Sequence, residues 1–191
     1  MKEIISQTLA DHKRVAVELE SFNSQIEAIA SQVVACLKAG GKLIFLGNGG
    51  SATDAMHMAG EYVSKFSKPR QSLPALALTD NVAVLTSIAN DFGYENLFTR
   101  QMESLAARED LVMAFSTSGE SKNIVRALEF CKKQGIRSVS FTGSKENTMK
   151  QLSDTCFQAP SDQTARIQEA YFFINHLICE VVDANFERSQ A

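Results

Sequence analysis

The chain has 191 residues, 45% of them hydrophobic and 21% charged, a composition typical of a globular protein with one substantial core. Its net charge of -3 provides no basic field for nucleic acid, and no apolar run reaches the roughly 18 residues that a membrane-spanning helix needs. We therefore expect neither nucleic acid nor a membrane among its partners.

Four cysteines, Cys36, Cys131, Cys156 and Cys179, are scattered along the chain without a CxxC pair. The first residues, "MKEIISQTLADHK", are polar and lack the pattern of a secretory signal peptide. Both observations favour reduced, mostly buried thiols in a cytoplasmic protein.

The first part of the chain, residues 1–38, contains neither Pro nor Gly and is rich in helix-forming residues. It predicts one or two helices that end at Gly40 and Gly41. From residue 42 onward, short apolar runs alternate with longer helical segments. The runs predict strands at 42–47, 74–78, 110–116, 136–143 and 155–160, and the other segments predict helices at 51–66, 81–90, 94–107, 120–135 and 163–187.

This alternation predicts an α/β fold with a doubly wound, five-stranded parallel sheet and helices on both faces. We see neither an internal repeat nor a linker, so we expect a single domain over residues 1–191, with a helical segment at 1–40 and an α/β core at 41–191. Ligands of such sheets bind at the carboxyl ends of the strands, and the two most informative loops both follow predicted strands.

The first loop, "GNGGS" at residues 47–51, leads into a predicted helix, with Ser51 expected as the N-cap. Glycines let the backbone approach a ligand closely, and the free amides and positive helix end favour an anion. The spacing matches neither the dinucleotide pattern nor the nucleoside-triphosphate pattern. From this loop alone, an anion site and an ordinary strand-to-helix turn are equally supported.

The second loop, "STSGES" at residues 116–121, supplies hydroxyl groups beside another set of free amides. In isolation it is most simply explained as helix capping. In the commonest order of five strands, 2-1-3-4-5, the first and third strands are neighbours, so both loops would border one crevice. Neither loop contains Lys or Arg, which favours a monophosphate held by hydroxyls and amides over a triphosphate with magnesium.

Two residues of the predicted helix 51–66, His57 and Glu61, are spaced i and i+4, which places them on one face, about 6 Å apart along the axis. A solvated surface pair is the commonest outcome of this spacing. The flanking segment "AMHMAGEYV" is apolar and small, however, and indicates that the face is partly buried. A buried carboxylate needs a partner, and a raised pKa would suit it for proton transfer.

Of the three histidines in the chain, His176 lies in an otherwise apolar helix, where a hydrogen-bonded core residue is more common than a ligand. Gln168 precedes it by about 12 Å along the axis, so the spacing does not show that the two meet. Arg166 and Glu169 fit a salt bridge or an interface equally well. The residues alone thus indicate a phosphorylated ligand and leave open whether the helices carry an acid–base site or a metal site.

Four segments, "LGNGGSATDAMHMAGEY", "IANDFGYENLF", "FSTSGESKNIVRAL" and "ARIQEAYFFINHL", resemble the sugar-isomerase (SIS) domain family. Two of their parts, "MHMAGEY" and "RIQEAYFFINH", are similar to its heptose branch, the sedoheptulose 7-phosphate (phosphoheptose) isomerases. The similarity covers nearly the whole chain. It implies a flavodoxin-like strand order and the conversion of sedoheptulose 7-phosphate to D-glycero-D-manno-heptose 7-phosphate by enediol-type proton transfer. That reaction is the first step toward heptose for lipopolysaccharide or other surface glycans.

The resemblance also implies roles for single residues. Glu61 would be the general base and His176 the general acid. One zinc ion per subunit would be held by His57, Glu61, Gln168 and His176. The sugar phosphate would be contacted by Asn48, Gly49, Gly50, Glu61, Asn90, Asp91, Ser116, Thr117, Ser118, Ser121 and Gln168. The family forms homotetramers with active sites where subunits meet, and the amino-terminal helices pack across them.

Two positions depart from the family pattern: Lys65 stands where some members have arginine, and Ala165 where some have aspartate, which leaves the exact sugar preference open. The alternative function is that of a non-catalytic SIS protein that binds the bacterial replication initiator. Such proteins typically lack the groups that match Glu61 and His176. A sugar-phosphate sensor fused to a DNA-binding domain is disfavoured because the chain has no basic helix-turn-helix segment.

Overall fold

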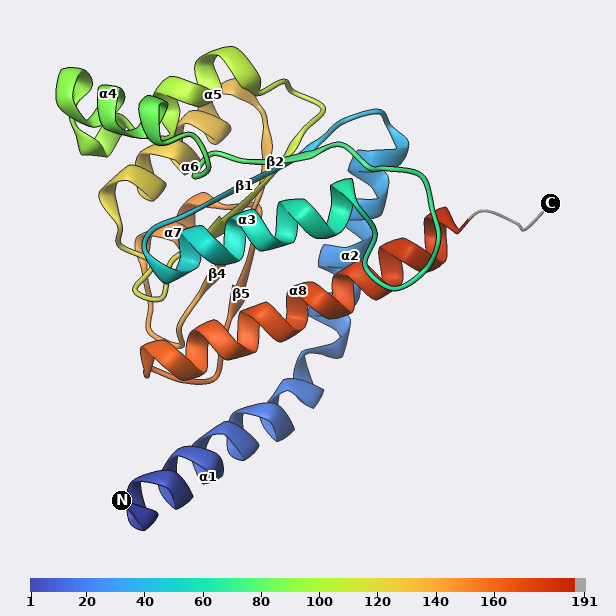
Figure 1. Ribbon diagram of the computed structural model, residues 1–191, viewed down its shortest axis with the longest axis vertical. Helices are drawn as coiled ribbons and strands as arrows, with labels where there is room; N and C mark the ends of the chain where they lie inside the picture. Colours follow the sequence, from blue (N-terminus) through green and yellow to red (C-terminus); the bar gives the residue numbers. More distant parts are fainter. Residues whose placement is uncertain (188–191) are drawn as a thin grey trace.

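The computed structural model describes residues 1–187 and shows, within that range, one sheet of five strands with helices on both faces (Figure 1). All neighbouring strands are parallel, and their order is β2-β1-β3-β4-β5. The predicted fold class and strand order are therefore confirmed. The strands are β1 Leu43–Gly47, β2 Ala75–Ala77, β3 Leu111–Phe115, β4 Arg137–Thr142 and β5 Thr155–Gln158.

Helices connect these strands and cover the two faces of the sheet. Consecutive residues of β1 point to opposite faces: Leu43 and Phe45 pack toward α2, α3 and α8, whereas Ile44 and Leu46 pack toward α4, α5, α6 and α7. The α-helices are α1 Lys2–Glu18, α2 Asn23–Lys38, α3 Gly50–Val63, α4 Val82–Phe92, α5 Thr99–Leu105, α6 Lys122–Gln134, α7 Thr148–Leu152 and α8 Thr164–Phe186. No helix within residues 1–187 is both long and apolar enough to cross a membrane.

Most predicted helices are present, and the differences have local causes. The predicted helix 94–107 is wrong in its first part, which is a 3-10 turn, η2 Tyr94–Asn96, after Gly93 ends α4 with a φ of 86°. The sequence prediction missed α7, because five residues are too few to show an apolar period. The amino-terminal segment forms two helices joined by another 3-10 turn, η1 Leu19–Phe22.

The predicted helix 51–66 ends three residues early, at Val63. An arginine side chain supplies the hydrogen bonds that a further helical turn would have supplied. Arg70 donates to the carbonyl oxygens of Glu61 at 2.6 Å and Tyr62 at 2.8 Å. In a longer helix these oxygens would accept from backbone amides of the next turn. The guanidinium therefore terminates α3 and holds the backbone of Glu61.

The same arginine forms a fully buried ion pair with Asp183 of α8. The distance from Nε of Arg70 to Oδ1 of Asp183 is 2.6 Å, and the two side chains are 1% and 0% exposed. The other carboxylate oxygen accepts from the amides of Ser67 at 2.7 Å and Lys68 at 2.9 Å. Burial alone would raise the pKa of Asp183, but these amides and the guanidinium outweigh it and lower that pKa. The pair joins the carboxyl-terminal parts of α3 and α8.

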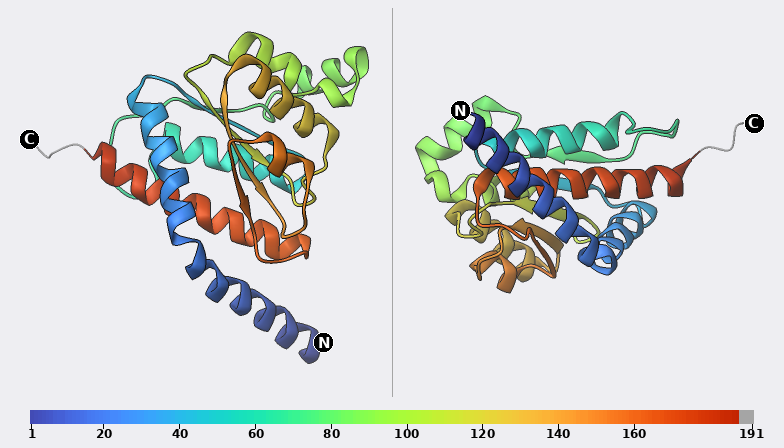
Figure 2. Two further views of the ribbon diagram at one scale, coloured as in Figure 1. Left: turned by 180° about the vertical axis from the view of Figure 1, so that it is seen from behind. Right: turned by 90° about the horizontal axis from the view of Figure 1, so that it is seen from below.

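The first helix, α1, extends away from the rest of the protein (Figures 1 and 2). It contacts the first turns of α8, where Nδ1 of His12 lies 2.7 Å from a carboxylate oxygen of Glu169. Four large apolar side chains of α1 remain exposed, Ile4 by 71%, Ile5 by 53%, Leu9 by 64% and Val17 by 57%. An apolar surface of this kind on a single helix indicates an interaction site.

We predict that Arg70→Met lowers the free energy of unfolding by about 3–5 kcal/mol, because it leaves the carboxylate of Asp183 buried without its partner. Urea unfolding at neutral pH measures the change. The matched control is Glu187→Gln, which breaks the exposed pair with Lys68, whose side chains are each 48% exposed, and should cost about 1 kcal/mol or less.

The sign of the pH dependence provides a second test. Since the pKa of Asp183 is lowered in the folded protein, its stabilising effect is present above the unfolded pKa of aspartate and is lost as pH falls through the lowered native value. Equal stability of Arg70→Met and the wild type at neutral pH would contradict this role of the buried pair.

Candidate active site

The loop that follows β1 and the beginning of α6, directly after the β3 loop, meet at the carboxyl edge of the sheet through a pair of asparagines. Asn48 and Asn123 exchange two side-chain hydrogen bonds, each of 2.8 Å, and Asn123 is 1% exposed. The hydroxyl of Tyr94 donates to Oδ1 of Asn48 at 2.9 Å. The predicted neighbourhood of the two loops is therefore confirmed, and the segment around Tyr94 joins them at the same edge.

The glycine loop differs in one detail from its prediction. Gly49, with a φ of 57°, holds the N-cap position, and Ser51 lies inside α3. The hydroxyl of Ser51 lies 2.5 Å from the hydroxyl of Tyr171 on α8 and is buried. The prediction of Ser51 as the N-cap was wrong, because the loop turns two residues earlier, on a glycine that tolerates positive φ. Ser51 instead ties the beginning of α3 to α8.

The serine loop gathers hydroxyl groups at the beginning of α6. Oγ of Ser116 lies 3.1 Å from Oγ of Ser121 and 3.4 Å from Oγ of Ser118, and it accepts from the amide of Gly119 at 3.2 Å. Thr117 and Ser118 line a surface hollow beside the loops after β4 and β5. Such a set of short hydroxyl side chains and amides can bind an anion by rotating its O–H groups outward.

A second group of polar side chains lies between α3 and α8, two helices that run side by side (Figures 1 and 2). Nε2 of His57 is 2.9 Å from Oε1 of Glu61 and 3.4 Å from Nε2 of His176. One ligand atom from each of the three residues lies within 4.8 Å of the others. The structure thus brings His176 to the pair on α3 and places it at a helix–helix groove rather than in the core.

Aromatic rings surround the two histidines. Phe172 lies edge-on to His57 with ring centroids 5.0 Å apart, and edge-on to His176 at 4.5 Å. Phe66 stacks on His176 with ring centroids 5.0 Å apart. These rings limit the movement of both imidazoles and partly exclude water from them.

The pKa of His176 is lowered by burial, and the neighbouring His57 lowers it further. The carboxylates of Glu61 and Glu180 act in the opposite direction and are outweighed. The lowered pKa favours the neutral imidazole at pH 7, which has one N–H that can be donated and one nitrogen that can accept a proton or bind a metal.

Gln168 lies in the second turn of α8, beside the beginning of α3. A Cβ on Gly50 would lie 2.7 Å from Nε2 of Gln168, so the amide packs directly against the glycine loop. A shallow pocket beside it is lined by Gly50, Asp54, Gln168 and Phe172, among others. Burial raises the pKa of Asp54 in this pocket, and Phe172 borders both the pocket and the histidines. Three of the four predicted metal ligands, His57, Glu61 and His176, therefore lie together, and Gln168 lies one helical turn before Phe172 on α8.

Asn90 and Asp91 are at the end of α4, which packs on the opposite face of the sheet from α3 and α8. Both are exposed, and Nδ2 of Asn90 donates to Oδ1 of Asp91 at 2.7 Å. They precede Tyr94, whose hydroxyl reaches Asn48 at the carboxyl edge of the sheet, by four and three residues.

Comparison with known proteins identifies the family to which the chain belongs. The family model described as the SIS domain matches residues 9–143. A phosphoheptose isomerase of Aneurinibacillus thermoaerophilus is 45% identical over 184 residues, which are 96% of this chain and 93% of that protein. Phosphoheptose isomerase 2 of Campylobacter jejuni is 44% identical over 164 residues, or 86% of this chain and 82% of the relative.

The chain belongs to the phosphoheptose isomerase family of SIS-domain proteins. Solved structures of the family agree with this: GmhA of Neisseria gonorrhoeae has a TM-score of 0.90 and 30% identity, with 96% of this chain and 98% of that chain covered. The enzyme of Francisella tularensis has a TM-score of 0.91 and 30% identity, with 95% and 97% covered. The Vibrio vulnificus NanR protein, at 15% identity and a TM-score of 0.66, shares only the fold.

The protein is accordingly a sugar-phosphate isomerase, and a phosphorylated heptose fits it as a substrate. Membership in this enzyme family favours catalysis over the alternative of a non-catalytic partner of the replication initiator. Several residues that shape the site were not found from the sequence, notably Asn123, Tyr94 and Phe172. Phe172 precedes His176 by four residues on the same helix, which was the available signal.

Proposed function

We propose that the enzyme converts sedoheptulose 7-phosphate to D-glycero-D-manno-heptose 7-phosphate, in the cytoplasm, as the first step toward heptose for lipopolysaccharide or other surface glycans. The observation that carries this proposal is the meeting of Glu61 and His176 between α3 and α8. The isomerisation moves a carbonyl from C2 to C1, and it requires one group that takes a carbon-bound proton and another that serves the oxygens.

In the proposed reaction, Glu61 removes a proton from C1 of the ketose while His176 gives one to the oxygen on C2, which produces an enediol. Return of the proton from Glu61 to C2, and transfer of the proton on the C1 oxygen to His176, then yields the aldose and restores both side chains. The edge-on ring of Phe172 would hold the imidazole in place and limit water at the enediol.

The phosphate end of the sugar would bind at the carboxyl edge of the sheet, where amides and hydroxyls of the two loops converge. This assignment is supported by the hydrogen bonds through Asn48 that join the loops. The proposed contacts are Asn48, Gly49, Gly50, Ser116, Thr117, Ser118, Ser121 and Gln168, with Asn90 and Asp91 as further contacts.

A metal ion fits the donor set between α3 and α8. Two imidazole nitrogens and a carboxylate oxygen are common zinc ligands, and those of His57, Glu61 and His176 lie within 4.8 Å of one another. We propose one zinc ion per subunit held by these residues, with Gln168 as the fourth ligand. When bound, zinc would supply a Lewis acid that polarises the carbonyl oxygen. A carboxylate has two oxygens, so Glu61 can ligate with one and keep the other for the proton.

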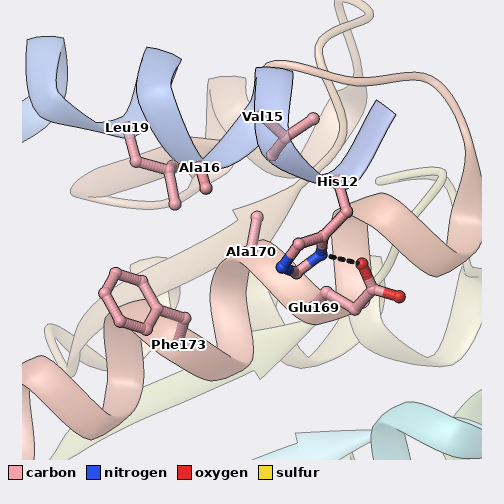
Figure 3. Close-up of a pocket in the computed structure, with 7 residues that line it drawn as sticks. All are labelled: His12, Val15, Ala16, Leu19, Glu169, Ala170 and Phe173. Atoms are coloured by element: carbon pink, nitrogen blue, oxygen red, sulfur yellow. Dashed lines mark hydrogen bonds and ion pairs between the residues drawn. The ribbon is translucent and has the colours of Figure 1, made fainter. Parts of the chain in front are cut away.

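We also propose that residues 1–191 form a single domain and that the segment 1–40 joins four copies into a homotetramer with active sites between subunits. The exposed apolar side chains of α1 support this proposal. Figure 3 shows a further apolar hollow where α1 meets α8, with Val15, Leu19 and Phe173 around it and the pair of His12 and Glu169 at its edge. Phe173 is 53% exposed in the single chain.

We predict that Glu61→Gln lowers kcat by about 10²–10⁴-fold, because the amide cannot accept the proton from C1, while the affinity for sedoheptulose 7-phosphate changes little. Aldose formation and isothermal titration measure the two effects. Glu180→Gln is the matched control, because Glu180 is an exposed carboxylate near His176 that lies outside the cluster of three, and it should retain activity. A fully active Glu61→Gln enzyme would exclude Glu61 as the base.

For the metal, we predict that His57→Ala reduces bound zinc from about one ion per subunit to a small fraction, since it removes one of the clustered donors. Elemental analysis of purified protein measures the ratio. His12→Ala serves as the control, because His12 pairs with Glu169 on another surface. Zinc content that is the same in both variants and the wild type would refute this site.

For the assembly, we predict that Leu9→Glu shifts the protein from a tetramer to smaller species, because a charge would be buried where α1 contacts a second subunit. Light scattering coupled to size-exclusion chromatography measures the mass. Lys133→Glu on α6 is the control, and it should leave the mass unchanged. A monomeric wild-type protein would contradict the proposed assembly.

A further inference from the structure

A polar hollow lies at the carboxyl ends of β3, β4 and β5, on the far side of the serine loop from Asn48. Thr117 and Ser118 line it from the loop after β3, and Lys145 lines it from the loop after β4. Asp162 lines it from the segment before α8, and Thr164 from the first turn of α8. Neither the glycine loop nor the serine loop contains Lys or Arg. Lys145 comes from a different loop, which the fold places beside the serine loop. This convergence concerns the phosphate end of the proposed substrate.

The backbone that carries Lys145 is held in a fixed position. Its carbonyl oxygen accepts from the side-chain amides of Asn147 at 2.8 Å and Gln158 at 2.9 Å. The amide of the preceding residue, Ser144, donates to the carbonyl of Ser161 at 3.0 Å. Three hydrogen bonds thus order the loop, while the side chain of Lys145 stays 79% exposed and free to move toward a ligand.

The same loop is packed tightly against the serine loop. The amide of Gly143 donates to the carbonyl of Thr117 at 3.1 Å. A Cβ on Gly143 would lie 2.6 Å from Cδ1 of Ile167 and 3.0 Å from that carbonyl oxygen, so only glycine allows this approach. A Cβ on Gly119 would likewise lie 2.3 Å from Oδ1 of Asn147. These close contacts therefore hold the backbone of the Lys145 loop beside the serine loop.

The charge of Lys145 is only loosely paired. Its Nζ lies 3.9 Å from Oδ2 of Asp162, and both side chains are mostly exposed, so the pair contributes little to stability. The other lysine of this region, Lys150, has a close partner in Glu146 at 2.5 Å. A phosphate monoester carries a charge of about −1.5 to −2 at neutral pH and would compete with the single carboxylate of Asp162 for the ammonium.

We propose that Lys145 is a phosphate-binding residue of this enzyme: its ammonium leaves Asp162 to contact the 7-phosphate held by the hydroxyls of Thr117 and Ser118. The proposal rests on the proposed function, since it requires a phosphorylated sugar. It makes Lys145 a determinant of specificity for phosphorylated over unphosphorylated sugars, and it makes Asp162 a competitor that weakens phosphate binding in the free enzyme.

Kinetics with sedoheptulose 7-phosphate test the two residues separately, because changes at Lys145 and at Asp162 should move KM in opposite directions. Lys145→Met should raise KM by about tenfold with kcat within about twofold, because it removes one charge-assisted hydrogen bond to the phosphate. Lys145→Arg should restore most of the affinity. Asp162→Asn should lower KM, because the ammonium loses its competitor. Lys133→Met, which removes the same charge from α6, is the control and should leave KM unchanged.

Two further measurements separate this proposal from the proposed function. With unphosphorylated sedoheptulose, Lys145→Met and the wild type should have equal kcat/KM, which a general loss of folding would not produce. Titration with inorganic phosphate alone should show about tenfold weaker binding by Lys145→Met, whether or not the sugar is isomerised. Unchanged KM and unchanged phosphate affinity in Lys145→Met would overturn the proposal. An inactive wild-type enzyme with a lysine-dependent phosphate affinity would overturn only the proposed reaction.

Discussion

The buried ion pair of Arg70 and Asp183 joins α3 to α8, and the relation between these two helices decides whether the polar residues on them can act together. A buried ion pair offsets the cost of losing its water only when other hydrogen bonds satisfy the charged groups. Here the carboxylate of Asp183 accepts hydrogen bonds from two backbone amides as well as from the guanidinium. The same guanidinium binds the carbonyl of Glu61. Arg70 therefore links the backbone of Glu61, the proposed base, to α8, the helix that carries His176.

A second constraint comes from the order of the strands. Because β1 and β3 are neighbours, with Gly47 paired to Phe115, the glycine and serine loops leave the sheet side by side. Asn48 and Asn123 then bond across the gap. A ligand at this edge meets amides and hydroxyls whose positions the sheet determines, which is suited to a phosphate that needs orientation more than strong charge.

The site extends along α3 and α8, from the glycine loop at the amino-terminal end of α3 to the histidine cluster in the middle of both helices. Gln168 and Phe172 lie between, the first against the glycine loop and the second against both imidazoles. A seven-carbon sugar phosphate has a charged end and a reactive end separated by several carbons, and the proposed function uses that separation. The charge of Lys145 would add to the first end without disturbing the second.

The sequence by itself determined the parallel sheet and the family, because apolar runs of five or six residues bounded by turns, and motifs such as "GNGGS" and "STSGES", are local in the chain. It also identified His57 and Glu61 as a pair, since helical spacing places them on one face. It left open whether His176 was a core residue or met them, missed Asn123 and Lys145, and placed Ser51 wrongly. The contacts of Asn48 with Asn123 and of His57 with His176 join residues 75 and 119 positions apart in sequence, and only the packing of the chain segments after β1 and β3 and of α8 on α3 could decide them. The place of Lys145 beside the serine loop likewise follows from the neighbouring positions of β3 and β4 in the sheet, and the N-cap at Gly49 from the backbone of the turn.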